Sequence, residues 1–312
     1  MTLAAVAPPR TPARRHLLDV DGLSRSELQA HLDLAAELRE RRERGERLEA
    51  LAGQTVGLAF LEPSTRTRVS FELAARALGA DPIDLSPGAS SVTKGESLVD
   101  TLRTLERTGV GTVVLRHAAS GAPYLAAQTT GLRIVNAGDG THAHPTQALL
   151  DALTLRDALG GLEGVCIAIV GDVAHSRVAR SNLHALSRLG ARIRVAGPPG
   201  MVAGFAAWPG LEVARTIEAA LDGADAVMTL RIQLERAAGG AVPSLAEYAR
   251  TWGLTSERLA LARPGAPVLH PGPTNEGVEI SAELASSRHS LIGRQVENGV
   301  AVRMAVLALL AA

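Results

Sequence analysis

Short apolar runs alternate with amphipathic stretches along most of this 312-residue chain. Four apolar runs occur in the first half, TVGLAF, PIDL, GTVVLR and RIVNA. A pattern with helical periodicity follows each run, near residues 66–78, 97–108, 122–130 and 145–159. Strands that read as continuous apolar runs and alternate with helices are typical of parallel sheets covered on both faces. The first half is therefore predicted to form an α/β domain.

A second series of the same kind fills most of the remaining chain. Its apolar runs are VCIAIVGD, ARIRVAG, DAVMTLR and APVLHPGP, and a helix is expected near 176–189 after the first of them. A last helix is expected near 292–311, with no strand after it. We therefore predict an α/β fold of two doubly wound parallel-sheet domains joined by helices.

No proline- or glycine-rich linker separates the two series, so their boundary has to be inferred. We place it in the helix near 145–159, which the pair Gly160-Gly161 ends before the next strand begins. The predicted domains are residues 1–150 together with the C-terminal helix 291–312, and residues 151–290. A chain of this length is long for one hydrophobic core, which also favours two domains.

The first helix has a clear start signal. Ser24 and Glu27 form the sequence pattern of a capping box, and Leu23 and Leu28 form that of a hydrophobic staple. We expect a helix from this point toward Arg44.

Composition argues against several classes of protein. The 32 basic residues balance the 32 acidic ones, and only 3 Phe, 2 Tyr and 2 Trp are present, whereas a nucleic-acid-binding domain needs a basic surface and usually aromatic rings. The single cysteine, Cys166, lies in an apolar run, which favours a buried inert thiol in a reducing compartment. The N-terminal apolar stretch is too short for a signal peptide, and the C-terminal helix is too short for a membrane span. We expect a cytoplasmic protein that binds neither nucleic acid nor membrane.

Polar clusters follow several predicted strands, at the edge where parallel α/β sheets bind ligands. The segment Ser64-Thr65-Arg66-Thr67 follows the run TVGLAFL and opens a helix, so it offers hydroxyls, backbone N–H groups and a guanidinium to an anion. A phosphate-binding site is the stronger interpretation, and a capped helix with exposed arginines is the alternative. Arg68 is left open, because the helix can turn it toward structural contacts.

Two further strand ends carry candidate chemistry. Arg116 ends the run GTVVLR, where a plain surface charge is an equally weighted alternative. His144 precedes Pro145, a favoured first residue of a helix, and Gln147 lies in the first turn of that helix. Beside two glycine turns, His144 is interpreted as a polarising group, although a lone His-Pro pair is usually structural.

The second series carries a cluster of cations and amides. Arg177 opens a helix after the first strand, and Arg231, Gln233 and Arg236 follow the strand DAVMTL. Guanidinium groups at neighbouring strand ends suit carboxylates, which they bind through two parallel hydrogen bonds. The turn before Arg177 lacks the three glycines of G-x-G-x-x-G and gives only weak support for a dinucleotide site.

Two loops complete the set of candidates. Pro271 and Pro273 fix a rigid loop whose carbonyl groups can accept hydrogen bonds from N–H groups of a ligand, and a plain proline turn is the equally weighted alternative. The segment SSVTKGES supplies Ser90 and Lys94 in a polar loop. This loop is a mobile lid, a contact to another subunit or simply solvated.

These motifs occur together in one known family. The segments STRTR, SSVTKGE, HPTQ, GDVAHSR, RIQLER and HPGPTNEGVEI have the order and spacing of the aspartate/ornithine carbamoyltransferases, and the resemblance covers nearly the whole chain after about residue 15. The chain is closer to the aspartate-specific members. Ornithine-specific members carry a His-Cys-Leu-Pro loop, whereas this chain has His270-Pro271-Gly272-Pro273. It departs from the family pattern at Thr274-Asn275-Glu276, where an acid replaces a common arginine.

The resemblance implies an enzyme that transfers the carbamoyl group of carbamoyl phosphate to L-aspartate, early in pyrimidine synthesis, with no cofactor and no metal. It also implies an active site in the cleft between the two domains. The assembly it implies is a homotrimer, or a larger assembly of trimers, whose subunits share active sites. Whether a regulatory chain or a dihydroorotase binds the trimer stays open.

The resemblance also implies a role for each matching residue. It assigns the phosphate to Ser64, Thr65, Arg66 and Thr67; the carbonyl oxygen to Thr67, Arg116 and His144; the carbamoyl nitrogen to Gln147, Gly272 and Pro273; the aspartate carboxylates to Arg177, Arg231, Gln233 and Lys94; and a contribution from the adjacent subunit to Ser90 and Lys94. The residues implied to be catalytic are Arg66, Thr67, Arg116, His144 and Lys94. We further expect Glu62 to pair with Arg177 and Arg236 when the two domains close.

Two other classes of protein make different predictions. A nucleotide-dependent dehydrogenase would carry a glycine fingerprint, which is missing from this sequence. A non-catalytic anion-binding subunit would have lost His144, Arg116 or Lys94, and all three are present. Within the family, transfer to ornithine or to another amino acid is the remaining alternative.

Overall fold

A computed structural model describes residues 15–85, 96–232 and 244–312 of the chain. The chain divides into two compact units. The first unit comprises residues up to 140 together with 299–312, and the second comprises residues 141–298. The domain limits inferred from the sequence, at 150 and 290, stay predictions.

A four-stranded parallel sheet forms the centre of the first unit. Its strands lie in the order β2-β1-β3-β4. They are β1 (Thr55–Phe60), β2 (Asp81–Asp84), β3 (Thr112–His117) and β4 (Arg133–Asp139). All pairs are parallel, as predicted from the apolar runs, and the register places Phe60 opposite Arg116. The carboxyl ends of β1 and β3 are therefore neighbours.

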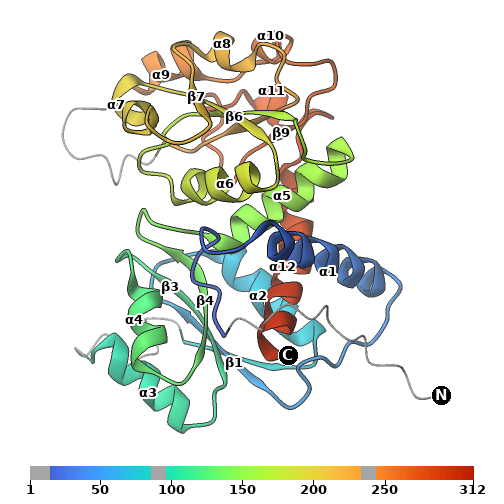
Figure 1. Cartoon of the computed structure of the whole chain (residues 1–312), viewed down its shortest axis with the longest axis vertical. Helices are drawn as coiled ribbons and strands as arrows, with labels where there is room; N and C mark the ends of the chain where they lie inside the picture. Colours follow the sequence, from blue (N-terminus) through green and yellow to red (C-terminus); the bar gives the residue numbers. More distant parts are fainter. Residues whose placement is uncertain (1–14, 86–95, 233–243) are drawn as a thin grey trace. The chain divides into compact units, whose positions relative to one another are not determined.

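Helices cover both faces of this sheet. They are α1 (Arg25–Glu43), α2 (Thr65–Ala77), α3 (Leu98–Arg107) and α4 (Ala122–Thr129). Side chains of α3 and α4 pack with those of β1, β3 and β4 in one apolar cluster, and Figure 1 shows α1 and α2 on the other face. The predicted capping box of α1 is confirmed, since Ser24 and Glu27 exchange both hydrogen bonds. All four helices start within one residue of their predicted starts.

The second unit holds a five-stranded parallel sheet in the order β7-β6-β5-β8-β9. Its strands are β5 (Cys166–Val170), β6 (Arg192–Ala196), β7 (Leu211–Val213), β8 (Ala226–Thr229) and β9 (Val268–Leu269). The strands β5 and β8 are direct neighbours, with Val170 opposite Thr229. The fold predicted from the sequence, two α/β units with parallel sheets, is confirmed.

The helices of the second unit also cover two faces. They are α5 (Pro145–Leu159), α6 (Arg177–Arg188), α7 (Pro199–Val202), α8 (Ile217–Leu221), α9 (Leu245–Trp252), α10 (Ser256–Leu259) and α11 (Ala282–Ala285), with a 3-10 turn, η3, at Ala203–Phe205. Helices α8 to α11 pack on one face of the sheet in a single apolar cluster. Helices α5 and α6 pack against each other. The last helix, α12 (Ile292–Ala311), matches its predicted bounds and contains the division between the units at residue 299.

Cys166 begins β5 and is buried, as the apolar run predicts. Burial raises the pKa of its thiol above the usual value. Because the thiolate is the reactive form, we expect the native protein to react very slowly with Ellman's reagent at about pH 8, and denatured protein to release one equivalent of thionitrobenzoate. Rapid reaction of the native protein would contradict the buried position.

Candidate active site

The predicted phosphate-binding segment lies at the start of α2 in the first unit. Ser64 is the residue before the helix, and its side chain makes no capping hydrogen bond. The first turn also contains no acidic residue, so the N-terminal N–H groups and the helix dipole favour an anion. Thr67 is buried, whereas Arg66 is exposed, and among the described residues its guanidinium makes no hydrogen bond or ion pair. This local geometry can bind a phosphate.

Arg68 turns away from this role. Its Nη1 lies 2.8 Å from Oδ2 of Asp84, which ends β2. The sequence left Arg68 undecided between ligand and structural contact, and the structure gives it a structural partner. Among the described residues, the guanidinium of Arg68 therefore has an ion-pair partner and that of Arg66 has none, although the two arginines are only two positions apart in one helical turn.

Arg116 lies at the same edge of the sheet as the start of α2. The backbone N–H of Leu61 donates to the carbonyl oxygen of Arg116 over 2.9 Å, which fixes the ends of β1 and β3 side by side. The Arg116 guanidinium donates to Oε1 of Glu62 and to the carbonyl oxygen of Ala137, both over 3.3 Å. Glu62 thus contacts Arg116 in this structure, a pairing that the sequence did not suggest. Its expected pairing with Arg177 and Arg236 on closure stays a prediction, and Arg236 lies outside the described residues.

In the second unit, His144 and Gln147 lie at the start of α5. Pro145 is the first helical residue, as predicted, and His144 is the residue before it, with only 4% of its surface exposed. The backbone N–H of His144 donates to Oγ of Ser181 on α6 over 2.9 Å. The Gln147 side chain is also buried, and its Nε2 donates to Oδ1 of Asp151 one turn later. Hydrogen bonds therefore hold the backbone of His144 and the side chain of Gln147.

The predicted carboxylate-binding arginines follow two adjacent strands. Arg177 is the first residue of α6, after β5, and it is buried. Arg231 follows β8 and is half-buried. Since β5 and β8 pair in parallel, both arginines come from the same edge of the sheet. The other predicted residues of this group, Gln233, Arg236, Ser90 and Lys94, lie outside the described residues.

Side chains that the sequence did not single out hold the loop 270–273. His270 is buried, and its Nδ1 accepts a hydrogen bond from the N–H of Gly272 over 2.8 Å. Its Nε2 lies 3.1 Å from Oε1 of the buried Glu279, and the same carboxylate oxygen accepts from the N–H of Asn275. The ring proton therefore lies on Nε2. The peptide bond between Gly272 and Pro273 is cis.

Tyr248 packs under the end of β5. A Cβ atom at Gly171 would lie 2.9 Å from the Tyr248 hydroxyl, and the positive φ of Gly171, +130°, also requires glycine. Burial, followed by the charges of Glu279 and Asp172, raises the pKa of Tyr248. The raised pKa keeps the Tyr248 hydroxyl protonated further into the alkaline range than that of an exposed tyrosine. Sequence alone gave no signal for this residue, because it lies on a helix, α9, with an ordinary amphipathic pattern.

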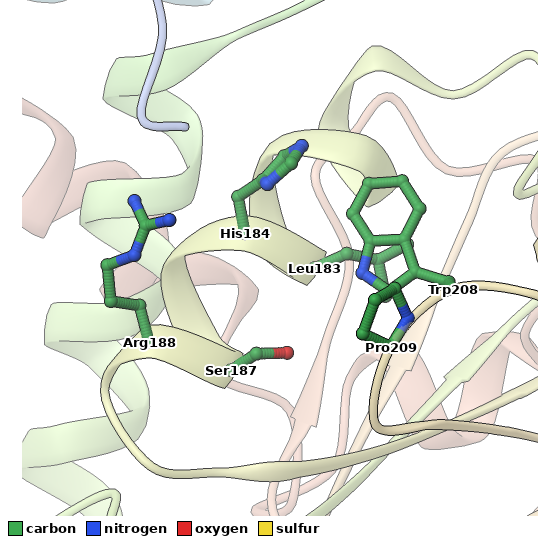
Figure 2. Close-up of a pocket in the computed structure, with 6 residues that line it drawn as sticks. All are labelled: Leu183, His184, Ser187, Arg188, Trp208 and Pro209. Carbon is green, nitrogen blue, oxygen red and sulfur yellow. The ribbon is translucent and has the colours of Figure 1, made fainter. Parts of the chain in front are cut away.

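A hollow beside α6 is separate from these residues (Figure 2). Its volume is ≈ 520 Å³, and its lining residues are Leu183, His184, Ser187, Arg188, Trp208 and Pro209. The rings of His184 and Trp208 meet edge to face, with centroids 4.7 Å apart. None of the predicted substrate-binding residues lines this hollow.

Residues 15–85, 96–232 and 244–312 contain no group of three or more His, Cys, Asp or Glu side chains placed to hold a metal ion. In the same part of the chain, no helix is long and apolar enough to cross a membrane.

Two segments of the chain match two domain models of one known family. Residues 15–157 match a family model described as the aspartate/ornithine carbamoyltransferase carbamoyl-P binding domain, and residues 163–310 match the Asp/Orn binding domain of the same family. The aspartate carbamoyltransferase catalytic subunit of Gluconobacter oxydans is 54% identical over 302 residues, covering 96% of each chain. That of Sorangium cellulosum is 55% identical over 299 residues, covering 96% of this chain and 93% of the relative.

Solved structures of an aspartate transcarbamoylase and of an ornithine carbamoyltransferase both have backbones similar to that of this chain. Aspartate transcarbamoylase from Trypanosoma cruzi, in complex with N-(phosphonacetyl)-L-aspartic acid, has a TM-score of 0.84 at 31% identity and covers 93% of this chain and 94% of its own. Ornithine carbamoyltransferase from Pyrococcus furiosus has a TM-score of 0.85 at 28% identity, with 95% and 97% covered. The backbone alone therefore does not distinguish the acceptors.

Proposed function

This chain belongs to the aspartate/ornithine carbamoyltransferase family, and on that basis we propose that it transfers the carbamoyl group of carbamoyl phosphate to L-aspartate. The observation that carries the choice of acceptor is the pair Arg177 and Arg231, which follow adjacent parallel strands. Two cations at one sheet edge suit the two carboxylates of aspartate and disfavour the cationic side chain of ornithine. The curated relatives at 54% and 55% identity support the same acceptor.

Carbamoyl phosphate binds through its phosphate at the start of α2. The support is the open N-terminus of this helix, with its hydroxyls at Ser64 and Thr65 and the exposed guanidinium of Arg66. Thr67, Arg116 and His144 donate to the carbonyl oxygen. The carbamoyl –NH2 group donates to acceptors on Gln147 and on the Gly272-Pro273 segment.

The reaction is an attack by a neutral amine on a carbonyl carbon. A C–N bond forms between aspartate and the carbamoyl carbon, giving a tetrahedral oxyanion. The C–O bond to phosphate then breaks, and the departing phosphate takes the amine's proton. Donors aimed at the oxyanion and the alignment of two bound anions supply the rate enhancement. His144 acts best here as a hydrogen-bond donor, and the chemistry calls for no cofactor and no metal.

The enzyme assembles as a homotrimer, or a larger assembly of trimers, in the cytoplasm. Ser90 and Lys94 of an adjacent subunit complete each site, and Lys94 and Gln233 add contacts to aspartate. The support for these statements is the resemblance of the segments SSVTKGE and RIQLER to the family. The single buried cysteine agrees with a reducing compartment.

The experiment that tests this function is an assay of the purified chain with carbamoyl phosphate and either L-aspartate or L-ornithine. We expect phosphate release and a product with the mass of N-carbamoyl-L-aspartate. Phosphate release with ornithine alone would overturn the proposed acceptor.

A further inference from the structure

A buried carboxylate, Asp151, joins three side-chain amides within the second unit. Its Oδ1 accepts from Nε2 of Gln147 over 2.9 Å and from Nε2 of Gln295 over 2.7 Å. Its Oδ2 accepts from Nδ2 of Asn182 over 2.8 Å. Asp151 is 0% exposed, and the three amides come from α5, α12 and α6. A buried charge is costly, and several N–H donors are the usual compensation.

The chemistry of the carboxylate fixes how each amide is turned. An ionised carboxylate only accepts hydrogen bonds, so it selects the NH2 end of every amide that contacts it. The amide of Gln147 therefore directs its carbonyl oxygen away from Asp151. That oxygen is an acceptor, and an acceptor is what a carbamoyl –NH2 group requires. An asparagine at position 151 could donate as well as accept, and the amide of Gln147 would then be free to reverse.

A series of hydrogen bonds also connects the Asp151 carboxylate to the loop 270–273. Because Nε2 of Gln295 is held by Asp151, its Oε1 is turned toward the loop, where it accepts from the N–H of His270 over 3.0 Å. The ring of His270 in turn accepts from the N–H of Gly272. One hydrogen-bonded chain thus runs from Asp151 through Gln295 and His270 to the segment that carries the other acceptors for the carbamoyl nitrogen.

We propose that Asp151 is a positioning residue that makes the site specific for a carbamoyl group. It turns the Gln147 amide, and through Gln295 and His270 it holds the 270–273 loop, so that both present carbonyl oxygens to the –NH2 of the donor substrate. A methyl group in place of –NH2 cannot donate a hydrogen bond to these oxygens. The inference rests on the proposed function, because it takes carbamoyl phosphate as the donor.

The test compares two stable analogues by calorimetric titration of the intact enzyme. Phosphonoacetamide carries an –NH2 group where acetonylphosphonate carries a methyl group, and both carry the same phosphonate. The wild type should bind the amide at least about tenfold more tightly, the factor that corresponds to one good hydrogen bond. In Asp151→Asn this ratio should fall to about one to three, while the affinity for acetonylphosphonate changes by less than about threefold.

The chain offers a matched control on the same helix. Thr154 is buried on α5, and its hydroxyl accepts from Nδ2 of Asn298 on α12 over 3.0 Å. Thr154→Val removes a buried hydrogen bond between the same two helices without touching Gln147. It should lower the unfolding temperature and leave the ratio of the two affinities at the wild-type value, so a purely structural effect is distinguished from positioning.

Each outcome decides a different claim. A wild-type ratio retained in Asp151→Asn overturns the positioning role and leaves the proposed function intact. A wild type that binds both analogues equally overturns recognition of the –NH2 group, and one that binds neither overturns the proposed function as well. If Asp151→Asn does not fold, Gln295→Met replaces it in the test. Its ratio of the affinities for the two analogues should be about threefold lower than that of the wild type, because only the connection to the loop 270–273 is lost. An unchanged ratio in Gln295→Met overturns the proposal.

Discussion

Replacing Arg66 by alanine should lower kcat/KM for carbamoyl phosphate by about a hundred- to a thousandfold, the usual cost of removing one charged donor from a developing transition state. Arg66 is exposed in the first turn of α2 and has no hydrogen-bond or ion-pair partner among the described residues. Its loss should therefore leave folding unchanged. Steady-state kinetics at saturating aspartate, with thermal unfolding of the same samples, measure both effects.

Arg68→Ala is the matched control for this prediction. Arg68 occupies the same helical turn but pairs with Asp84, and both side chains are about one-third exposed. Such a surface pair contributes at most about 1 kcal/mol, so kcat/KM should stay within about threefold of wild type. Equal losses of activity in the two variants would show that general positive charge matters, and would contradict a specific role for Arg66.

Replacing His144 by alanine should lower kcat by about a hundredfold and change KM for carbamoyl phosphate much less. The reason is that a donor to the carbonyl oxygen strengthens its hydrogen bond as the oxygen becomes an oxyanion. His144 makes no side-chain capping bond to α5, so the helix start at Pro145 should survive. Stopped assays of phosphate release over a range of carbamoyl phosphate concentrations separate kcat from KM.

His142→Ala controls for damage to the loop before α5. His142 lies two positions upstream and is half-buried. Its replacement should leave kcat within about threefold of wild type. If His144→Ala raised KM and left kcat unchanged, His144 would bind ground state and transition state equally, and its assignment as an oxyanion donor would be wrong.

Local patterns in the sequence predicted most of the fold because its elements are locally specified. The capping box at Ser24, the proline that opens α5 and the apolar runs of β1 and β5 are all signals of a few residues. Parallel pairing followed from the alternation of strands and helices. The order of strands within each sheet was not predicted, since it depends on contacts between distant segments.

The sequence indicates candidate site residues only where polar side chains are concentrated in a short motif. The cluster Ser64 to Thr67 and the pair His144 and Gln147 each fit in one helical turn. Sequence could not decide the direction of Arg68, because that direction depends on Asp84 at the end of another strand. Nor could it suggest that Glu62 contacts Arg116, 54 positions later.

The hydrogen bonds around Asp151 also join residues that are far apart in the sequence. Gln295 lies 144 positions from Asp151 and 25 from His270, so no local pattern connects them. In the sequence, Asp151 is one polar position in a mostly apolar helix, and Glu279 is one acid among 32 acidic residues. Their roles emerge only when the helices α5, α6 and α12 and the loop after β9 are placed together within the second unit.

The most direct test of the central claim is the choice of acceptor by the purified enzyme. Phosphate release from carbamoyl phosphate should be measured with L-aspartate, with L-ornithine and with no acceptor, in parallel and over a range of concentrations. We expect kcat/KM for aspartate to exceed that for ornithine by at least about a thousandfold, because a site built for two carboxylates leaves charged groups unpaired with the wrong substrate. A preference for ornithine, or phosphate release that is the same with and without aspartate, would contradict the account.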